Sequence, residues 1–169
     1  MIKPRKTCGS TGHALDDRVM VRTSDESSTL ALGRRLGRLL RGWDVVCLYG
    51  DLGSGKTTLT RGLAQGLGSR SRVASPTFGL ARVYRAKPWL IYHLDLYRVA
   101  PDQTRDIGLE EFVSDPKGIC VVEWPEVGES YYPKDRLDVR LEHCRNGRTL
   151  KFKPRGPRGR EILSGLGRS

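Results

Sequence analysis

The apolar residues of this 169-residue chain fall into short runs that are separated by polar and glycine-containing segments. Runs at 45–49, 90–94 and 118–124 have the length and the Val, Ile and Leu content typical of strands buried on both faces of a sheet. Two later runs, 137–141 and 150–152, flank an Asn-Gly pair, which favours an antiparallel hairpin. The pattern therefore predicts a sheet with a hairpin near its C-terminal end.

Helical segments are predicted between these runs. Leucines recur every four residues in the stretch that begins near Lys56, which is the spacing of one helix face. An earlier helix is expected to open on a capping box formed by Thr23 and Glu26 and to stop at Gly42. A short helical turn is expected at 107–112. Helices thus separate most of the predicted strands.

This alternation is typical of an α/β fold with a mainly parallel central sheet and helices on both faces. In such sheets, ligands bind at the carboxyl ends of the parallel strands. We expect one domain at 21–153, because an apolar fraction of 37% suits a single core. Residues 1–20 predict a disordered basic leader, and 154–169 predict a basic C-terminal tail.

The positive charge is concentrated at the two ends of the chain. The formal net charge is +11; residues 145–169 carry eight Lys or Arg and one Glu, and residues 1–22 carry five basic and two acidic residues. Such ends can contact RNA phosphates or an acidic protein surface, and a solvated tail without a ligand is the alternative. No apolar run approaches the length of about 20 residues that a membrane helix needs, so we expect a soluble, cytoplasmic protein.

The turn between the first strand and the helix at Lys56 carries the clearest chemical signal. Gly50, Gly55, Lys56 and Thr57 satisfy the phosphate-binding pattern of glycine, four free positions, glycine, lysine and serine or threonine. Backbone N–H groups in such a turn and the positive end of the following helix attract an anion. The predicted nucleotide-binding residues of the turn are Asp51, Leu52, Gly53, Ser54, Gly55, Lys56, Thr57 and Thr58.

Within this turn, the side chains of Lys56 and Thr57 have specific predicted roles. The Lys56 ammonium should reach the β and γ phosphates, and the Thr57 hydroxyl should bind a magnesium ion. A glycine-rich turn without a ligand is the alternative. With the phosphate-binding turn included, the prediction becomes a three-layer fold of the P-loop NTPase type.

Two carboxylates, Asp95 and Glu123, stand where predicted strands end. Magnesium near phosphates needs one or two carboxylate ligands, and the carboxyl ends of parallel strands converge. Glu123 is expected to bind the metal or to orient the attacking water, and Asp95 to share the metal shell. The alternative is a carboxylate that caps a helix or pairs with Arg98. His93 is interpreted as a packing or hydrogen-bonding residue rather than a base.

A sequence "SPTF" at 75–78 lies within the predicted loop 70–81. Proline biases the preceding residue toward extended backbone and leaves the Thr77 hydroxyl available to sense a γ phosphate or to position water. A plain turn stabilised by Ser or Thr side chains is the alternative.

In series, the stretches "YGDLGSGKTTLTRGL", "SPTF", "YHLDLYR", "IGLEEF" and "VEWPE" resemble the TsaE family, also called YjeE, over about residues 20–153. The resemblance implies a small ATPase that requires ATP and Mg²⁺. It implies a role in the threonylcarbamoyl modification of adenosine 37 in tRNAs that read codons beginning with A. It further implies weak hydrolysis alone, docking on a TsaB–TsaD pair, and contact with tRNA indirectly or through that complex.

The same resemblance implies roles for individual residues. Arg148 matches a position of nucleotide contact, Thr77 lies in a switch-like loop, and the segment around Asp25 lies near the adenine side. Residues that match the phosphate, metal and acidic positions of the family are Lys56, Thr57, Glu123 and Asp95.

Two other functions compete with this interpretation. A small-molecule kinase uses the same phosphate grip, but it needs a second substrate pocket. A non-enzymatic RNA-binding module would explain the charged ends but not Asp95 and Glu123. Guanine recognition through an Asn-Lys-x-Asp motif is excluded, because Asn146 is the only asparagine and Gly147 follows it.

Overall fold

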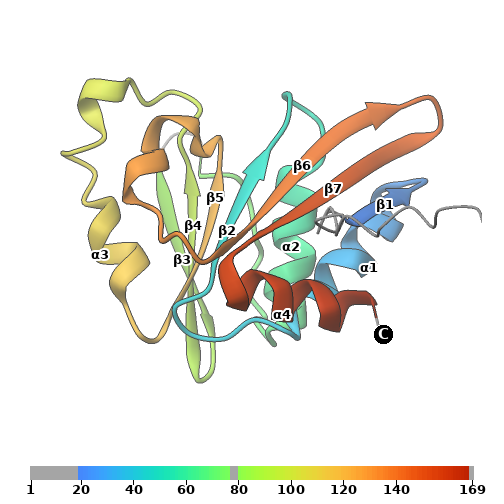
Figure 1. Cartoon of the computed structure of the whole chain (residues 1–169), viewed down its shortest axis with the longest axis horizontal. Coiled ribbons are helices and arrows are strands. Elements are labelled where there is room, and N and C mark those ends of the chain that lie inside the picture. Colours follow the sequence, from blue (N-terminus) through green and yellow to red (C-terminus); the bar gives the residue numbers. More distant parts are fainter. Residues whose placement is uncertain (1–18, 77–79, 168–169) are drawn as a thin grey trace, which may run out of the picture.

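A computed structural model describes residues 19–76 and 80–167, which form a mixed seven-stranded sheet with helices on both faces (Figure 1). The elements in chain order are β1 (Val19–Thr23), α1 (Glu26–Gly37), β2 (Val45–Tyr49), α2 (Lys56–Gly66), β3 (Ala81–Ala86), β4 (Trp89–Asp95), the 3₁₀ helix η1 (Pro101–Gln103), α3 (Leu109–Ser114), β5 (Gly118–Glu123), the 3₁₀ helix η2 (Pro125–Tyr131), β6 (Arg136–Cys144), β7 (Gly147–Arg155) and α4 (Gly156–Gly167). Within the described residues, no helix is long and apolar enough to cross a membrane.

The strand order is β1-β7-β6-β2-β5-β4-β3. The four central strands, β6, β2, β5 and β4, are parallel to one another, whereas β7, β1 and β3 join the sheet antiparallel. The α/β fold class and the antiparallel hairpin of β6 and β7 are therefore confirmed. Strands β1 and β3, at the two edges, were not predicted from the apolar pattern.

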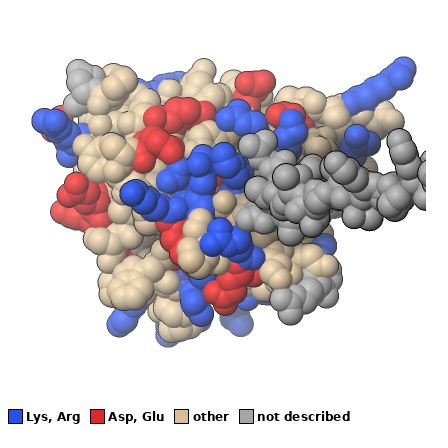
Figure 2. Space-filling view, in the orientation of Figure 1, with Lys and Arg blue, Asp and Glu red and all other residues tan. Residues whose placement is uncertain are grey.

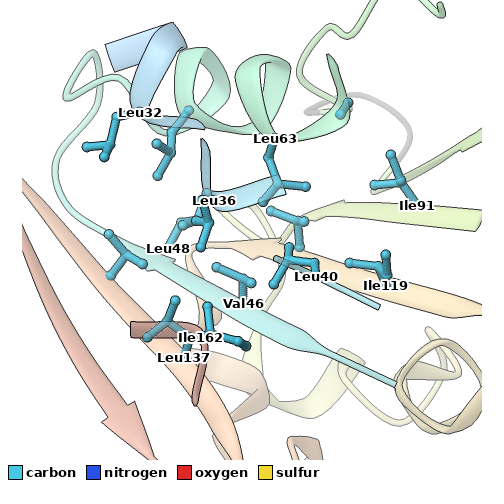
Figure 3. Close-up of a cluster of buried hydrophobic side chains, with 14 of the residues drawn as sticks. Leu32, Leu36, Leu40, Val46, Leu48, Leu63, Ile91, Ile119, Leu137 and Ile162 are labelled. Carbon is cyan, nitrogen blue, oxygen red and sulfur yellow. The ribbon is translucent and has the colours of Figure 1, made fainter. Parts of the chain in front are cut away.

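Two hydrophobic cores lie on opposite faces of the sheet, because side chains alternate along each strand. In β2, Val46 and Leu48 point into the core beneath α1, α2 and α4, while Val45 and Cys47 point into the core beneath α3. Figure 3 shows Leu63 of α2 in the first of these cores, close to the β2 side chains. These four β2 side chains are buried. The strand that leads into the phosphate-binding turn is thus fixed from both sides.

Helices α1 and α2 cross closely on the first face. A Cβ at Gly37 would lie 2.2 Å from the carbonyl oxygen of Leu63, and one at Gly66 would lie 2.2 Å from that of Arg34. These contacts leave no room for a side chain, so the glycines permit the close crossing. The crossing helps to fix α2, whose N-terminus forms the candidate site described below.

The start of α1 differs from the prediction. The N-cap is Asp25, whose Oδ1 accepts a hydrogen bond from the Ser28 backbone N–H at 2.7 Å, while the Ser28 hydroxyl oxygen accepts one from the Asp25 N–H at 3.1 Å. The predicted capping residue, Thr23, ends β1 instead. The helix also ends at Gly37 and not at the predicted stop, Gly42. Thr23 with Glu26 and Asp25 with Ser28 both have the spacing of a capping box. Because Thr23 is paired with β7 as part of β1, the helix begins after Asp25.

The prediction of a solvated tail after residue 153 is wrong for the described part of that segment. Residues Gly156–Gly167 form α4, and Ile162, Leu163 and Leu166 are buried in the first core. These apolar residues recur at helical spacing, but the surrounding charge and glycine obscured that pattern. The Arg158 guanidinium pairs with Asp44 at 2.7 Å. This helix is therefore part of the domain.

We expect Arg158→Ala to destabilise the protein by about 3 kcal/mol, because it leaves the carboxylate of Asp44 buried without its ion-pair partner. Asp44 is only 5% exposed. The matched control is Arg160→Ala, which removes an exposed arginine from the same helix. The measurement is the free energy of unfolding in urea, and equal values for the two variants would contradict the expected role of the pair.

Candidate functional site

The phosphate-binding turn leaves the N-terminus of α2 open. Gly55 is the N-cap and has a φ of +102°, a left-handed conformation that favours glycine. No side chain caps this helix, so its first N–H groups are available for an anion. A Cβ at Gly55 would also lie 2.8 Å from Nε of Arg148, so a side chain there would displace that guanidinium.

A cavity of about 410 Å³ lies against this helix end. It is enclosed by the turn, the first residues of α2, and the segments that follow β4 and β5. Its lining residues are Leu52, Gly53, Gly55, Lys56, Thr57, Thr58, Ser75, Asp95, Tyr97, Arg98, Glu123, Trp124 and Arg148. The sheet therefore brings together segments that are far apart in the sequence.

Lys56 is held inside the turn. Its Nζ donates hydrogen bonds to the carbonyl oxygens of Gly50 at 2.6 Å and Asp51 at 2.9 Å, and lies 4.0 Å from the centre of the Trp124 ring. Burial lowers the pKa of the ammonium, while the nearby carboxylates of Glu123 and others act in the opposite direction. The charge is thus positioned beside the open helix end.

Glu123, at the end of β5, is bound from two sides. The Thr57 hydroxyl donates a hydrogen bond to its Oε1 at 2.9 Å, and His93 Nε2 lies 2.8 Å from the same oxygen. Because an ionised carboxylate only accepts hydrogen bonds, Nε2 of His93 carries the proton. Glu123 is 3% exposed and His93 is fully buried. His93 is therefore a hydrogen-bonding residue, as predicted, and it orients Glu123.

Asp95 lies beside Glu123, because the two residues are direct partners in the register of β4 and β5. One oxygen of Asp95 accepts a hydrogen bond from the Ser75 hydroxyl at 2.7 Å, and the other accepts one from the Tyr97 N–H at 3.1 Å. These bonds fix the orientation of the carboxylate. Two adjacent acidic groups thus face a lysine and an open helix end across one cavity.

Arg148 reaches this cavity from β7. Its Nε is buried and has no hydrogen-bond partner within the part of the chain that the structure describes. A buried donor without a partner is costly, and an anion in the cavity would supply one. The guanidinium packs against Gly55 of the turn. The site therefore has a second cation.

Comparison with known proteins identifies the family. The family model described as "Threonylcarbamoyl adenosine biosynthesis protein TsaE" matches residues 23–150. This chain belongs to the TsaE family. It is 35% identical over 146 residues to the "tRNA threonylcarbamoyladenosine biosynthesis protein TsaE" of Haemophilus influenzae, covering 83% of this chain and 92% of that protein. It is 47% identical over 118 residues to the protein of the same name from Streptomyces coelicolor, covering 67% and 78%.

A solved structure extends the similarity to the TsaE fold. The crystal structure of Bacillus subtilis YdiB matches with a TM-score of 0.76 and 31% sequence identity, covering 89% of this chain and 95% of that one. The TsaE family takes part in tRNA threonylcarbamoyladenosine biosynthesis. The matched residues 23–150 include every residue that lines the cavity.

Most of the predicted site residues of this TsaE family member lie in the cavity lining, but three of those that the structure describes do not. Asp51 contributes its carbonyl oxygen to Lys56, and Ser54 is fully buried behind the turn. Asp25 caps α1, and the hydrogen bond from the Ser28 backbone N–H lowers its pKa to about 2. Thr77 lies outside the described residues. Predicted residues that do line the cavity are Leu52, Gly53, Gly55, Lys56, Thr57, Thr58, Asp95, Glu123 and Arg148.

Aromatic residues of the TsaE site were missed by the sequence analysis. Trp124 covers Lys56, and the ring of Tyr97 lies 4.8 Å from that of Trp124. Tyr97 stands two residues after Asp95, and Trp124 directly follows Glu123. Their proximity to the two strand-end carboxylates was the signal in the sequence that could have placed them at the site. The rings form one wall of the cavity beside the lysine.

The donor set of the TsaE cavity suits a magnesium ion that is shared with phosphates. Among the described residues, no group of three or more His, Cys, Asp or Glu could hold a metal alone. Magnesium usually takes one or two carboxylates, several waters and substrate phosphates, so such a group is not required. The hydroxyl of Thr57 and the carboxylate of Glu123 supply adjacent hard oxygen atoms. These residues therefore fit the ion.

Proposed function

We propose that this TsaE-family protein is a magnesium-dependent ATPase that acts in tRNA threonylcarbamoyladenosine biosynthesis together with a TsaB–TsaD pair. One observation carries the proposal. The open N-terminus of α2, the Lys56 ammonium and the paired carboxylates Asp95 and Glu123 all line one cavity. This combination of an anion cradle and metal-binding oxygens suits a nucleotide triphosphate with its metal.

The phosphates would be held by backbone and by two cations. The first N–H groups of α2 face the cavity without a side-chain cap, and Gly55 permits close approach. Lys56 would exchange its bonds to the carbonyls of Gly50 and Asp51 for phosphate oxygens. The unpaired Nε of Arg148 would donate to the same ligand.

Thr57 and Glu123 would hold the magnesium ion, and Asp95, the register partner of Glu123, would share its water ligands. When bound, the ion would offset the negative charge of the phosphates. Glu123 would also orient a water molecule for attack, with its own position fixed by His93. Because Glu123 is already held in position, less conformational entropy is lost when the reactive geometry forms.

Exposed apolar side chains at the cavity support the proposal that a partner protein binds there. Leu52 is 73% exposed and Tyr97 is 50% exposed, although both are large and apolar and line the cavity. Exposed apolar side chains beside a site are typical of a protein interface. We infer that a TsaB–TsaD pair docks here in the cytoplasm, that hydrolysis is weak before docking, and that tRNA acts through the complex.

The test is release of inorganic phosphate from ATP by the purified full chain, measured with and without magnesium and with and without TsaB–TsaD. We expect slow release that requires magnesium and increases when the pair is added. ADP formation without phosphate release would instead indicate transfer to another acceptor, as in a small-molecule kinase. Absence of any ATP turnover in the complex would contradict the ATPase proposal.

A further inference from the structure

A second cavity lies on the sheet face that points away from the core beneath α1, α2 and α4. Side chains alternate along β6 and β7, so that Val139 and Phe152 point into the core beneath the helices while their neighbours point the other way. The outward residues include a set that we call the basic face. It consists of Arg22 of β1, Arg140 of β6, and Lys151, Lys153 and Arg155 of β7.

The strand register places these cations side by side. Arg140 is the direct partner of Lys151, and Arg136 is the direct partner of Arg155. Like charges directly opposite each other destabilise a sheet. Asp138 compensates the second pair, because its oxygens lie 2.9 Å from Nε of Arg136 and 2.7 Å from Nε of Arg155. In the first pair, Lys151 has the carboxylate of Glu142 as its partner, whereas Arg140 forms no ion pair within the described residues. A local conflict of this kind is typical of functional surfaces.

The acidic groups near the basic face are already paired. Glu142 bonds to Lys151, and Glu129 and Asp138 both bond to Arg136. In contrast, Arg22, Arg140 and Lys153 form no ion pair among residues 19–76 and 80–167, although Asp138 lies opposite Lys153 in the strand register. The face therefore carries uncompensated positive charge.

The shape of this surface also suits a ligand. A cavity of about 500 Å³, the lining of which includes Tyr49, Glu129 and four members of the basic face, lies beside η2. The Arg140 guanidinium lies 5.2 Å from the centre of the Tyr49 ring, which holds the arginine in place. Figure 2 shows Lys and Arg side chains gathered near the middle of one side of the molecule.

We propose that the basic face binds the phosphate backbone of RNA. The inference rests on the proposed function, because a protein of tRNA modification offers tRNA as the relevant polyanion. Lys151, Lys153 and Arg155 alternate along one strand and therefore recur about every 7 Å. A regular row of cations suits a polymer with regularly spaced phosphates. A protein partner would instead need an apolar interface centre, and the residues of this face are mainly charged.

Binding of this kind would depend on charge and shape rather than on base sequence. The Tyr49 ring is covered by Arg140, so it is not free to stack on a base. Phosphate contacts position a nucleic acid and carry no sequence information. Strand β7 also separates the two ligands: Arg148 points to the nucleotide cavity, whereas Lys151 and Lys153 point to the opposite face. RNA and ATP would thus bind the same chain at different places.

The test is fluorescence anisotropy of a labelled, unmodified tRNA transcript with the full chain over a series of salt concentrations. The variant combines Arg22→Ala, Arg140→Ala and Lys153→Ala, which breaks no ion pair among the described residues. We expect the slope of log K against log salt to fall by about 2 to 3, with at least about tenfold weaker binding at low salt. The matched control combines Arg82→Ala, Arg85→Ala and Lys87→Ala, which are exposed residues in or beside β3 and carry the same total charge.

The outcomes separate this proposal from the ATPase proposal. The control variant should bind tRNA as the unmodified chain does, and ATP binding should be unchanged in both variants. An unchanged salt slope in the first variant, or an equal loss in the control, would overturn the basic face as the RNA site. So would binding of poly-glutamate as tight as that of tRNA, because it would assign the face to an acidic protein. If the unmodified chain bound tRNA but not ATP, that result would count against the ATPase proposal and not against the basic face.

Discussion

Lys56→Ala is expected to abolish magnesium-dependent ATP binding. Lys56 is 4% exposed, and its ammonium stands at the open end of α2. Charge-assisted hydrogen bonds to phosphates contribute about 1.5–3 kcal/mol each. Two such bonds correspond to at least about 100-fold weaker binding. The measurement is equilibrium titration with ATP and magnesium, followed by the fluorescence of Trp124, or by calorimetry if the substitution itself alters that ring.

The control for this prediction is Lys134→Ala, which removes an exposed lysine outside the cavity and should leave ATP binding unchanged. Because Lys56 also bonds to two carbonyl oxygens of the turn, thermal unfolding of both variants must be compared. Undiminished ATP binding by a folded Lys56→Ala protein would show that the cavity is not the nucleotide site.

Glu123→Gln is expected to remove stimulated hydrolysis while it preserves the fold and most of the nucleotide affinity. Glutamine keeps the size of the side chain and an oxygen that accepts from Thr57, so the buried contacts are largely retained. It loses the negative charge that would bind magnesium and orient water. Loss of a group that positions or activates water costs about 100-fold or more in rate. The measurement is phosphate release in the presence of TsaB–TsaD.

Glu110→Gln on α3 is the matched control, because it neutralises an exposed glutamate outside the cavity. Equal stimulated rates for the Glu123 variant and the unmodified chain would remove Glu123 from the mechanism. A rate lost together with ATP binding would instead assign Glu123 to nucleotide affinity. The two variants of Lys56 and Glu123 thus test binding and hydrolysis separately.

Three cations, Lys56, Arg98 and Arg148, and two carboxylates account for the charge of the candidate site. Lys56 and Arg148 stand on the side of the turn, and Asp95 and Glu123 stand at adjacent strand ends. A nucleotide triphosphate carries negative phosphates and a positive metal, which match these two sides in turn. Each carboxylate also accepts a hydrogen bond, Glu123 from Thr57 and Asp95 from Ser75. These bonds offset part of the cost of burying two neighbouring carboxylates.

The sequence by itself determined the centre of the fold and the core of the candidate site. Continuous apolar runs predicted β2, β4 and β5 because strands buried on both faces need apolar side chains at every position. Neighbouring residues in the sequence were sufficient to predict the phosphate-binding turn before Lys56. They were also sufficient to predict a carboxylate at the end of β4 and of β5. Since parallel strands end at one edge, Asp95 and Glu123 were expected together, and the register makes them direct partners.

Only the tertiary structure decided which side chains from distant segments meet. Edge strand β1 and helix α4 are held by contacts with β7 and the first core, so their own residues gave weak local signals. The same pairing turns Arg148 toward the cavity of the candidate site and Lys151 and Lys153 away from it. Successive side chains on a strand point to opposite faces, and the face that each one occupies depends on partners far away in the chain. Charges that looked like a tail in the sequence therefore became a folded surface.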